Sequence, residues 1–191
     1  EDLDKDLKNK FKTTVKKHLM ITEKKRFLSK QTSNNQRLGL INAIFPDAIF
    51  VHIIRDGRAV ARSLINANWW GDMNFWERKG TPAKLKEKGQ SSNIEIAALH
   101  WKKNVKEILS HKKAFNERYM EVRYESLCKD TQGNIREILT SCNLSHYHDF
   151  SSLIPKDLKN MNYKWEKELT QSQKAKLNNT IGDFLDKLGY E

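Results

Sequence analysis

The sequence has few of the residues that cross-link small folds or form tight turns: its 191 residues include two cysteines, three prolines and eight glycines. Cys128 and Cys142 are too few for a disulfide framework or a zinc ribbon, and we expect two free buried thiols in a reducing compartment. No stretch approaches the roughly 20 consecutive apolar residues that a membrane-spanning helix needs. The composition excludes a collagen, a coiled coil, a membrane-spanning protein and a disulfide-rich miniprotein.

A glycine-rich phosphate loop and an export signal are also missing from the sequence. The eight glycines never cluster, and no Gly-x-x-x-x-Gly-Lys run occurs. The first residues, from Glu1 to Lys12, are charged rather than apolar, so we expect no signal peptide and a cytoplasmic protein.

Basic residues are in excess: 35 lysines and arginines stand against 24 aspartates and glutamates, a formal net charge of +11. This surplus favours polyanionic or phosphorylated partners without identifying one class. The lysine-rich stretches 5–17 and 79–88 are typical of solvated helix and loop faces. Because 38% of the residues are hydrophobic, residues 1–191 are expected to form a single domain with a real core.

Hydrophobic periodicity predicts helices that alternate with strands. Helical spacing of apolar residues is present in 3–19, 38–45, 59–65, 94–109, 135–139 and 170–188. Strands are expected at 26–29, 48–54 and 119–124, whereas 69–92 has no clear period and is expected to be mostly loop. Strands separated by helices are typical of a parallel α/β sheet.

The segment 48–65 predicts a strand, a turn and a helix. Its seven-residue apolar run at 48–54 is typical of a strand buried on both faces, and Asp56 or Gly57 is expected near the helix start. Arg55 would then lie beyond the carboxyl end of a strand, beside helix amides, where a phosphate binds well. The alternative is that Arg55 only pairs with a neighbouring carboxylate and stabilises the turn.

Several segments follow one another in a distinctive order. They are Lys30-Gln-Thr, Phe45-Pro-Asp-Ala, Phe50-Val-His-Ile-Ile-Arg-Asp-Gly-Arg-Ala-Val-Ala-Arg-Ser-Leu-Ile65, Val122-Arg-Tyr-Glu-Ser-Leu127, Tyr163-Lys-Trp165 and Leu188-Gly-Tyr190. From Phe27 to Tyr190 the chain thereby resembles the sulfotransferases that use 3′-phosphoadenosine 5′-phosphosulfate, notably the protein-tyrosine sulfotransferase-like branch and its bacterial relatives. The resemblance implies an α/β fold with a P-loop-NTPase-like parallel sheet flanked by helices.

The resemblance also implies residue roles. Arg55 matches the arginine that binds the 3′-phosphate of the donor, and Ser63 matches its partner serine. Tyr124 matches a residue near the adenine, and Lys164 matches a basic residue in the segment that folds over the nucleotide. Lys30 matches a lysine near the transferring sulfuryl group, where a positioned cation stabilises charge on the leaving phosphate.

The family's Gly-rich loop after the first strand has no counterpart here. We therefore expect the first strand and its loop to lie upstream and the chain to be a fragment, the alternative being a degenerate copy that keeps only the 3′-phosphate end. No general base is assigned. The implied reaction is metal-free transfer of a sulfuryl group to an acceptor hydroxyl or amine, leaving adenosine 3′,5′-bisphosphate. The acceptor (carbohydrate, lipid, small metabolite or peptide tyrosine) and the oligomeric state stay open.

Other functions and sites are weaker hypotheses. A noncatalytic nucleotide-binding remnant is one alternative, and a basic nucleic-acid-binding domain is disfavoured because the predicted strands are apolar rather than aromatic and basic. His146 and His148 have metal-like spacing but no third ligand nearby, and His52 is expected to be a buried structural histidine. Trp69, Trp70 and Trp76 fit an acceptor wall or core packing equally well.

Overall fold

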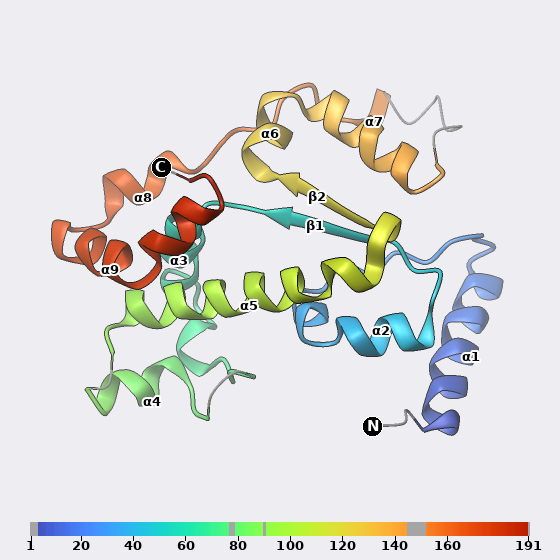
Figure 1. The fold of residues 1–191 in the computed structure, drawn as a ribbon, viewed down its shortest axis with the longest axis horizontal. Helices are drawn as coiled ribbons and strands as arrows, with labels where there is room; N and C mark the ends of the chain where they lie inside the picture. Colours follow the sequence, from blue (N-terminus) through green and yellow to red (C-terminus); the bar gives the residue numbers. More distant parts are fainter. Residues whose placement is uncertain (1–3, 77–78, 90, 145–151, 191) are drawn as a thin grey trace.

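The computed structural model describes residues 4–76, 79–89, 91–144 and 152–190, drawn as a ribbon in Figure 1. The helices are α1 (Lys5–Ile21), α2 (Leu38–Ile44), α3 (Gly57–Ile65), α4 (Pro82–Glu87), α5 (Asn93–Phe115), α6 (Tyr124–Lys129), α7 (Thr131–Ser141), α8 (Tyr163–Glu168) and α9 (Gln171–Lys187). The strands are β1 (Phe50–Ile54) and β2 (Tyr119–Arg123), and the 3-10 turns are η1 (Thr32–Gln36), η2 (Trp70–Asp72) and η3 (Asn116–Arg118).

The sheet of the described residues consists of β1 and β2, which pair in parallel from Phe50 with Tyr119 to Ile54 with Arg123. Figure 1 shows α5 running along one side of this pair and α6 with α7 on the other. The same view shows α8 and α9 near the carboxyl ends of the strands and α1 beyond their amino ends. This mixed helical fold with a small parallel sheet is compatible with the expected α/β class, and its P-loop-like character stays a prediction.

Local signals explain why several helices begin where they do. Ser92 and Glu95 form a capping box at the start of α5, and Thr170 and Gln173 form another at the start of α9. In each box the side chains satisfy backbone N–H groups that have no partner inside the helix.

The larger core forms where α3, α5 and α9 pack together. Ala61 of α3 and Ala97 of α5 are completely buried, and such small side chains allow the helices to approach closely. Gly57 is required for the same reason, because a Cβ there would lie 2.5 Å from ring carbons of Trp101 on α5. A second, smaller core contains Phe115, whose ring stacks on that of Phe50 with centroids 3.9 Å apart.

The expectation that the strand at 48–54, which is β1 in the structure, is buried on both faces is wrong. His52 and Ile54 are buried at 8% and 2% exposure, whereas Val51 and Ile53 on the opposite face are 37% and 52% exposed. The helix α5 covers the first face of β1. The second face of β1 keeps Val51 and Ile53 partly exposed, so it is covered less than the first.

The strand expected at 26–29 is also not found. Residues 24–31 run between α1 and η1 without a ladder partner. The segment is instead attached by side chains, since Arg26 donates to the carbonyl of Cys142 at 2.7 Å. An extended segment without a neighbouring strand has no backbone partners, so it does not become part of a sheet.

The loop predicted at 69–92 is mostly confirmed, but it contains α4 and η2. Within it Trp70 is buried and its indole N–H donates to Asn93 Oδ1 at 2.8 Å, so this tryptophan belongs to the core. Trp69 is exposed and Trp76 is half-buried. The two described cysteines, Cys128 and Cys142, are free thiols, the first buried and the second half-buried.

A polar triad connects β1 and β2, from the buried His52 through Tyr119 to the exposed Glu121. His52 Nδ1 is 2.8 Å from the hydroxyl of Tyr119, which donates to Glu121 Oε2 at 3.1 Å. The hydroxyl has one hydrogen, so the network is satisfied when His52 Nδ1 carries a proton and the ring is neutral. The burial of His52 and its contact with the Tyr119 hydroxyl confirm the expectation of a satisfied buried histidine. Burial also lowers the pKa of His52 below the ordinary 6.5. Among the described residues no helix has the length and apolar character to cross a lipid bilayer.

Gly57→Ala is expected to destabilise the protein by about 1–3 kcal/mol, because the added methyl group overpacks against Trp101. Urea unfolding measures the free energy of unfolding. Gly39→Ala is the matched control, since its Cβ would meet His111 at an ordinary 3.5 Å. Equal effects of the two substitutions would contradict the close approach at Gly57.

The free energy of unfolding is expected to fall as the pH drops below 6.5, and protonation of His52 is one cause of this fall. Because the folded-state pKa of His52 is lowered, the unfolded chain takes up a proton first, and the stabilisation present above 6.5 is lost as the pH falls toward the folded-state value. His52→Gln should flatten this dependence between pH 7.5 and 5.5 in urea unfolding. An unchanged slope in His52→Gln would exclude His52 as the titrating group.

Candidate functional site

The turns that follow β1 and β2 lie next to each other, because the carboxyl ends of parallel strands meet at the same edge of a sheet. Ile54 and Arg123 are register partners, so Arg55 and Tyr124 follow at adjacent places. This edge also holds the first turn of α3. It is the place at which the sequence predicts an anion site.

The start of α3 is organised by Asp56, which is the N-cap residue. Its carboxylate accepts the backbone N–H of Arg58 at 2.8 Å and pairs with the Arg58 guanidinium at 2.9 Å. The same guanidinium lies over the ring of Trp165 on α8, 4.5 Å from its centroid. One turn further, Arg62 forms an ion pair with Glu168. Both arginines of this helix face therefore contact carboxylates of the chain.

Arg55 is held differently, without a carboxylate partner among the described residues. Its guanidinium lies over the ring of Tyr124, with Cζ 4.2 Å from the centroid, and its Nε donates to Asn162 Oδ1 at 2.8 Å. Its two terminal nitrogens donate to none of the residues that the structure describes. The alternative in which Arg55 only pairs with a neighbouring carboxylate is therefore wrong, because Asp56 pairs with Arg58 instead.

The ring of Tyr124 is fixed by the chain segment that crosses this edge. Its hydroxyl donates to the carbonyl of Lys159 at 3.2 Å and accepts the backbone N–H of Met161 at 3.1 Å. Burial raises the pKa of Tyr124, so the phenol stays neutral and acts as a donor and a stacking surface. Residues 159–162 are thereby attached to the Arg55 site at both Tyr124 and Asn162.

Glu125 joins the segments of the site and was assigned no role from the sequence. Its Oε1 accepts the backbone N–H of Asp56 at 3.2 Å and the amide Nδ2 of Asn162 at 2.6 Å. Its Oε2 accepts the hydroxyl of Tyr190 at 3.3 Å. Burial, and secondly the charge of Glu125, raise the pKa of Tyr190. A signal for Glu125 was its position beside Tyr124 in a segment that resembles a family motif, whereas Asn162 had no local signal.

The other predicted site residues are not in contact with Arg55. Ser63 is exposed in the second half of α3, and six residues of helix from Gly57 correspond to about 9 Å along the axis. Lys164 is half-buried on α8, two residues after Asn162, and Lys30 is exposed between α1 and η1. Of the five predicted residues, the structure joins Arg55 to Tyr124 and places Lys164 on the helix that directly follows the segment attached to both.

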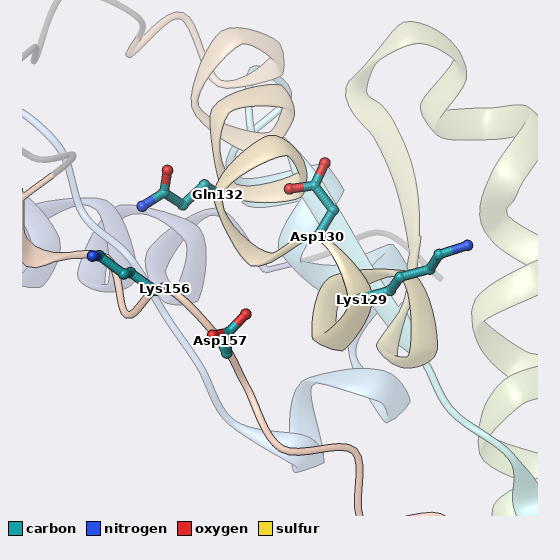
Figure 2. A pocket seen from close by; sticks show the side chains of 5 residues that line it. All are labelled: Lys129, Asp130, Gln132, Lys156 and Asp157. Carbon is teal, nitrogen blue, oxygen red and sulfur yellow. The ribbon is translucent and has the colours of Figure 1, made fainter.

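A separate open hollow of about 430 Å³ is lined by Lys129, Asp130, Gln132, Lys156 and Asp157. Figure 2 shows the amino groups of Lys129 and Lys156 extending in opposite directions. Asp130 is occupied as the N-cap residue of α7, where it accepts the N–H of Gly133 at 2.9 Å. These side chains do not converge on a common point, so the hollow is a weaker candidate than the Arg55 site.

No group of three or more metal-ligating side chains occurs within the described ranges. The histidines with metal-like spacing, His146 and His148, lie outside the described residues.

Comparison with known families gives one match. The family model described as "Sulfotransferase family" matches residues 2–149, well over half of the chain. No curated protein and no solved structure matches the chain significantly. The matched range contains β1, β2 and the turns with Arg55 and Tyr124.

Proposed function

The chain belongs to the sulfotransferase family, and from this premise we propose that it transfers a sulfuryl group from 3′-phosphoadenosine 5′-phosphosulfate to an acceptor hydroxyl or amine. The product of the donor is adenosine 3′,5′-bisphosphate. The acceptor class is a carbohydrate, a small metabolite or a peptide tyrosine.

The environment of Arg55 is the observation that carries this proposal. Its guanidinium is fixed at Nε by Asn162 and on one face by Tyr124, while no described carboxylate forms an ion pair with it. A cation that is held in place with two terminal nitrogens available suits a phosphate, which accepts parallel hydrogen bonds from such a fork. This arrangement supports Arg55 as the ligand of the donor's 3′-phosphate.

The remaining residues have proposed roles around this anchor. Tyr124 is assigned to the adenine side, because its aromatic ring is already fixed beside Arg55. Lys164 lies on α8, two residues after Asn162, and is assigned as a second positive charge. Ser63 is assigned as the partner of Arg55 on the 3′-phosphate, which requires this phosphate to lie along α3 between the two side chains.

The proposed reaction is an in-line displacement. The bond between the sulfur and the bridging phosphate oxygen breaks, a bond between the sulfur and the acceptor oxygen or nitrogen forms, and the acceptor proton passes to a base or to solvent. Negative charge develops on the leaving phosphate, and Lys30 is assigned to stabilise it. A cation in that role acts mainly in the transition state.

Arg55→Ala is expected to weaken binding of adenosine 3′,5′-bisphosphate by about 2 kcal/mol or more, because a charge-assisted hydrogen-bond donor is removed. Isothermal titration or a thermal-shift titration measures this, with adenosine 5′-monophosphate as the ligand without a 3′-phosphate. The wild-type chain should prefer the bisphosphate, and the variant should lose that preference.

Arg136→Ala is the matched control, since it removes one positive charge from α7, where the exposed side chain donates to Gln132 one turn away. An unchanged affinity in Arg55→Ala, or an equal loss in Arg136→Ala, would contradict the assigned site. Wild-type binding of the bisphosphate without transfer to any acceptor would favour the noncatalytic remnant.

Lys30→Ala is expected to lower turnover far more than donor affinity, because its charge is needed as the leaving phosphate develops. The measurement is release of adenosine 3′,5′-bisphosphate from the donor in the presence of a panel of hydroxyl and amine acceptors. Lys25→Ala, an exposed lysine of the same segment, is the control. Equal losses of turnover and affinity in Lys30→Ala would make Lys30 a binding residue only.

A further inference from the structure

The side chain of Asn162 connects two groups that do not touch each other. Its Nδ2 donates to Glu125 Oε1 at 2.6 Å, and its Oδ1 accepts Nε of Arg55 at 2.8 Å. The amide is planar and carries its oxygen and nitrogen on one carbon, so fixing the nitrogen also fixes the oxygen. We propose that Glu125 is a positioning residue that sets the direction of the Arg55 guanidinium through the Asn162 amide.

The carboxylate of Glu125 selects one of two orientations of the Asn162 amide. A carboxylate only accepts hydrogen bonds, so it binds the amide NH₂ group and turns the amide oxygen toward Arg55. Without Glu125 the amide nitrogen has no carboxylate to hold it, and only Arg55 itself favours the orientation with the oxygen toward Nε. The amide then turns more easily, and the direction of the terminal nitrogens of Arg55 is set less firmly.

Glu125 is itself held in place from two further sides. Its Oε1 also accepts the backbone N–H of Asp56 at the start of α3, and its Oε2 accepts the hydroxyl of Tyr190 beyond α9. Tyr190 is in turn covered by Arg123, whose guanidinium carbon lies 4.8 Å from the ring centroid. The carboxylate is therefore fixed relative to both strand ends, to α3 and to α9.

Positioning and simple electrostatics predict opposite effects on ligand affinity. Removing a negative charge near Arg55 would strengthen anion binding if the charge alone mattered. If Glu125 acts by position, Glu125→Ala weakens binding of adenosine 3′,5′-bisphosphate by about tenfold, the effect of losing a hydrogen bond to a charged group. Glu125→Gln keeps an acceptor for Asp56 and Asn162 and a donor toward the Tyr190 hydroxyl, so it should retain wild-type affinity within about twofold.

A double-mutant cycle tests whether the effect passes through Asn162. Asn162→Ala should weaken binding as Glu125→Ala does, and the double variant should be no weaker than either single one. Additive losses would overturn the relay, as would tighter binding in Glu125→Ala. Glu166→Gln, an exposed carboxylate on α8, is the control for a change of charge near the segment.

The affinity experiments rest on the proposed function, so a measurement without ligand separates the two. The hydrogen-exchange rate of Arg55 Nε–H, followed by NMR in the ligand-free chain, should rise about tenfold or more in Glu125→Ala and Asn162→Ala but not in Glu125→Gln. An unchanged rate in both alanine variants would overturn the positioning role whether or not the bisphosphate binds. A raised rate without wild-type binding would support the relay and reject the proposed donor site. If Glu125→Ala does not fold, Glu125→Leu, which fills a similar volume but offers Asn162 no acceptor, takes its place in both measurements.

Discussion

Parallel pairing of β1 with β2 is the constraint on which the site depends. The register places Ile54 beside Arg123, so β1 and β2 end at the same edge of the sheet. There β1 continues into the Arg55 turn, and β2 continues into the start of α6. Arg55 therefore stacks on Tyr124 although 69 residues separate them in sequence, because the long crossover through α5 returns the chain to the same edge. Helix packing stabilises this crossover, since α5 contacts both α3 and α9 along the larger core.

Charge at the site is distributed by pairing rather than by the overall surplus. The chain has a formal net charge of +11, yet Arg58 and Arg62 on α3 contact Asp56 and Glu168. Arg55 differs because the groups that hold it, an amide oxygen and an aromatic face, carry no full charge. A fixed and unneutralised cation attracts an anion more strongly than several paired ones, so the local arrangement carries more functional information than the total.

The family match covers only part of the residues that form the candidate site. The family match covers residues 2–149 and therefore does not include Asn162 or Tyr190. These two residues are nevertheless connected to the matched part through the Glu125 carboxylate. Asn162 and Tyr190 are thus held by side-chain hydrogen bonds next to the turns that form the site.

The sequence by itself determined the local features: the periodicity of α5 and α9, and the strand–turn–helix that places Arg55 before a helix beginning near Asp56 or Gly57. These depend on contacts within about one helical turn or one strand, which a short window of sequence contains. It also carried the family resemblance. The tertiary structure alone decided that β1 is exposed on one face, that residues 26–29 form no strand, and that Arg55 is bound by Asn162 rather than by a carboxylate. The Glu125 contacts, too, became visible only in the folded chain. Such outcomes depend on which segments pack beside each other, and Arg55 and Asn162 meet across 107 residues.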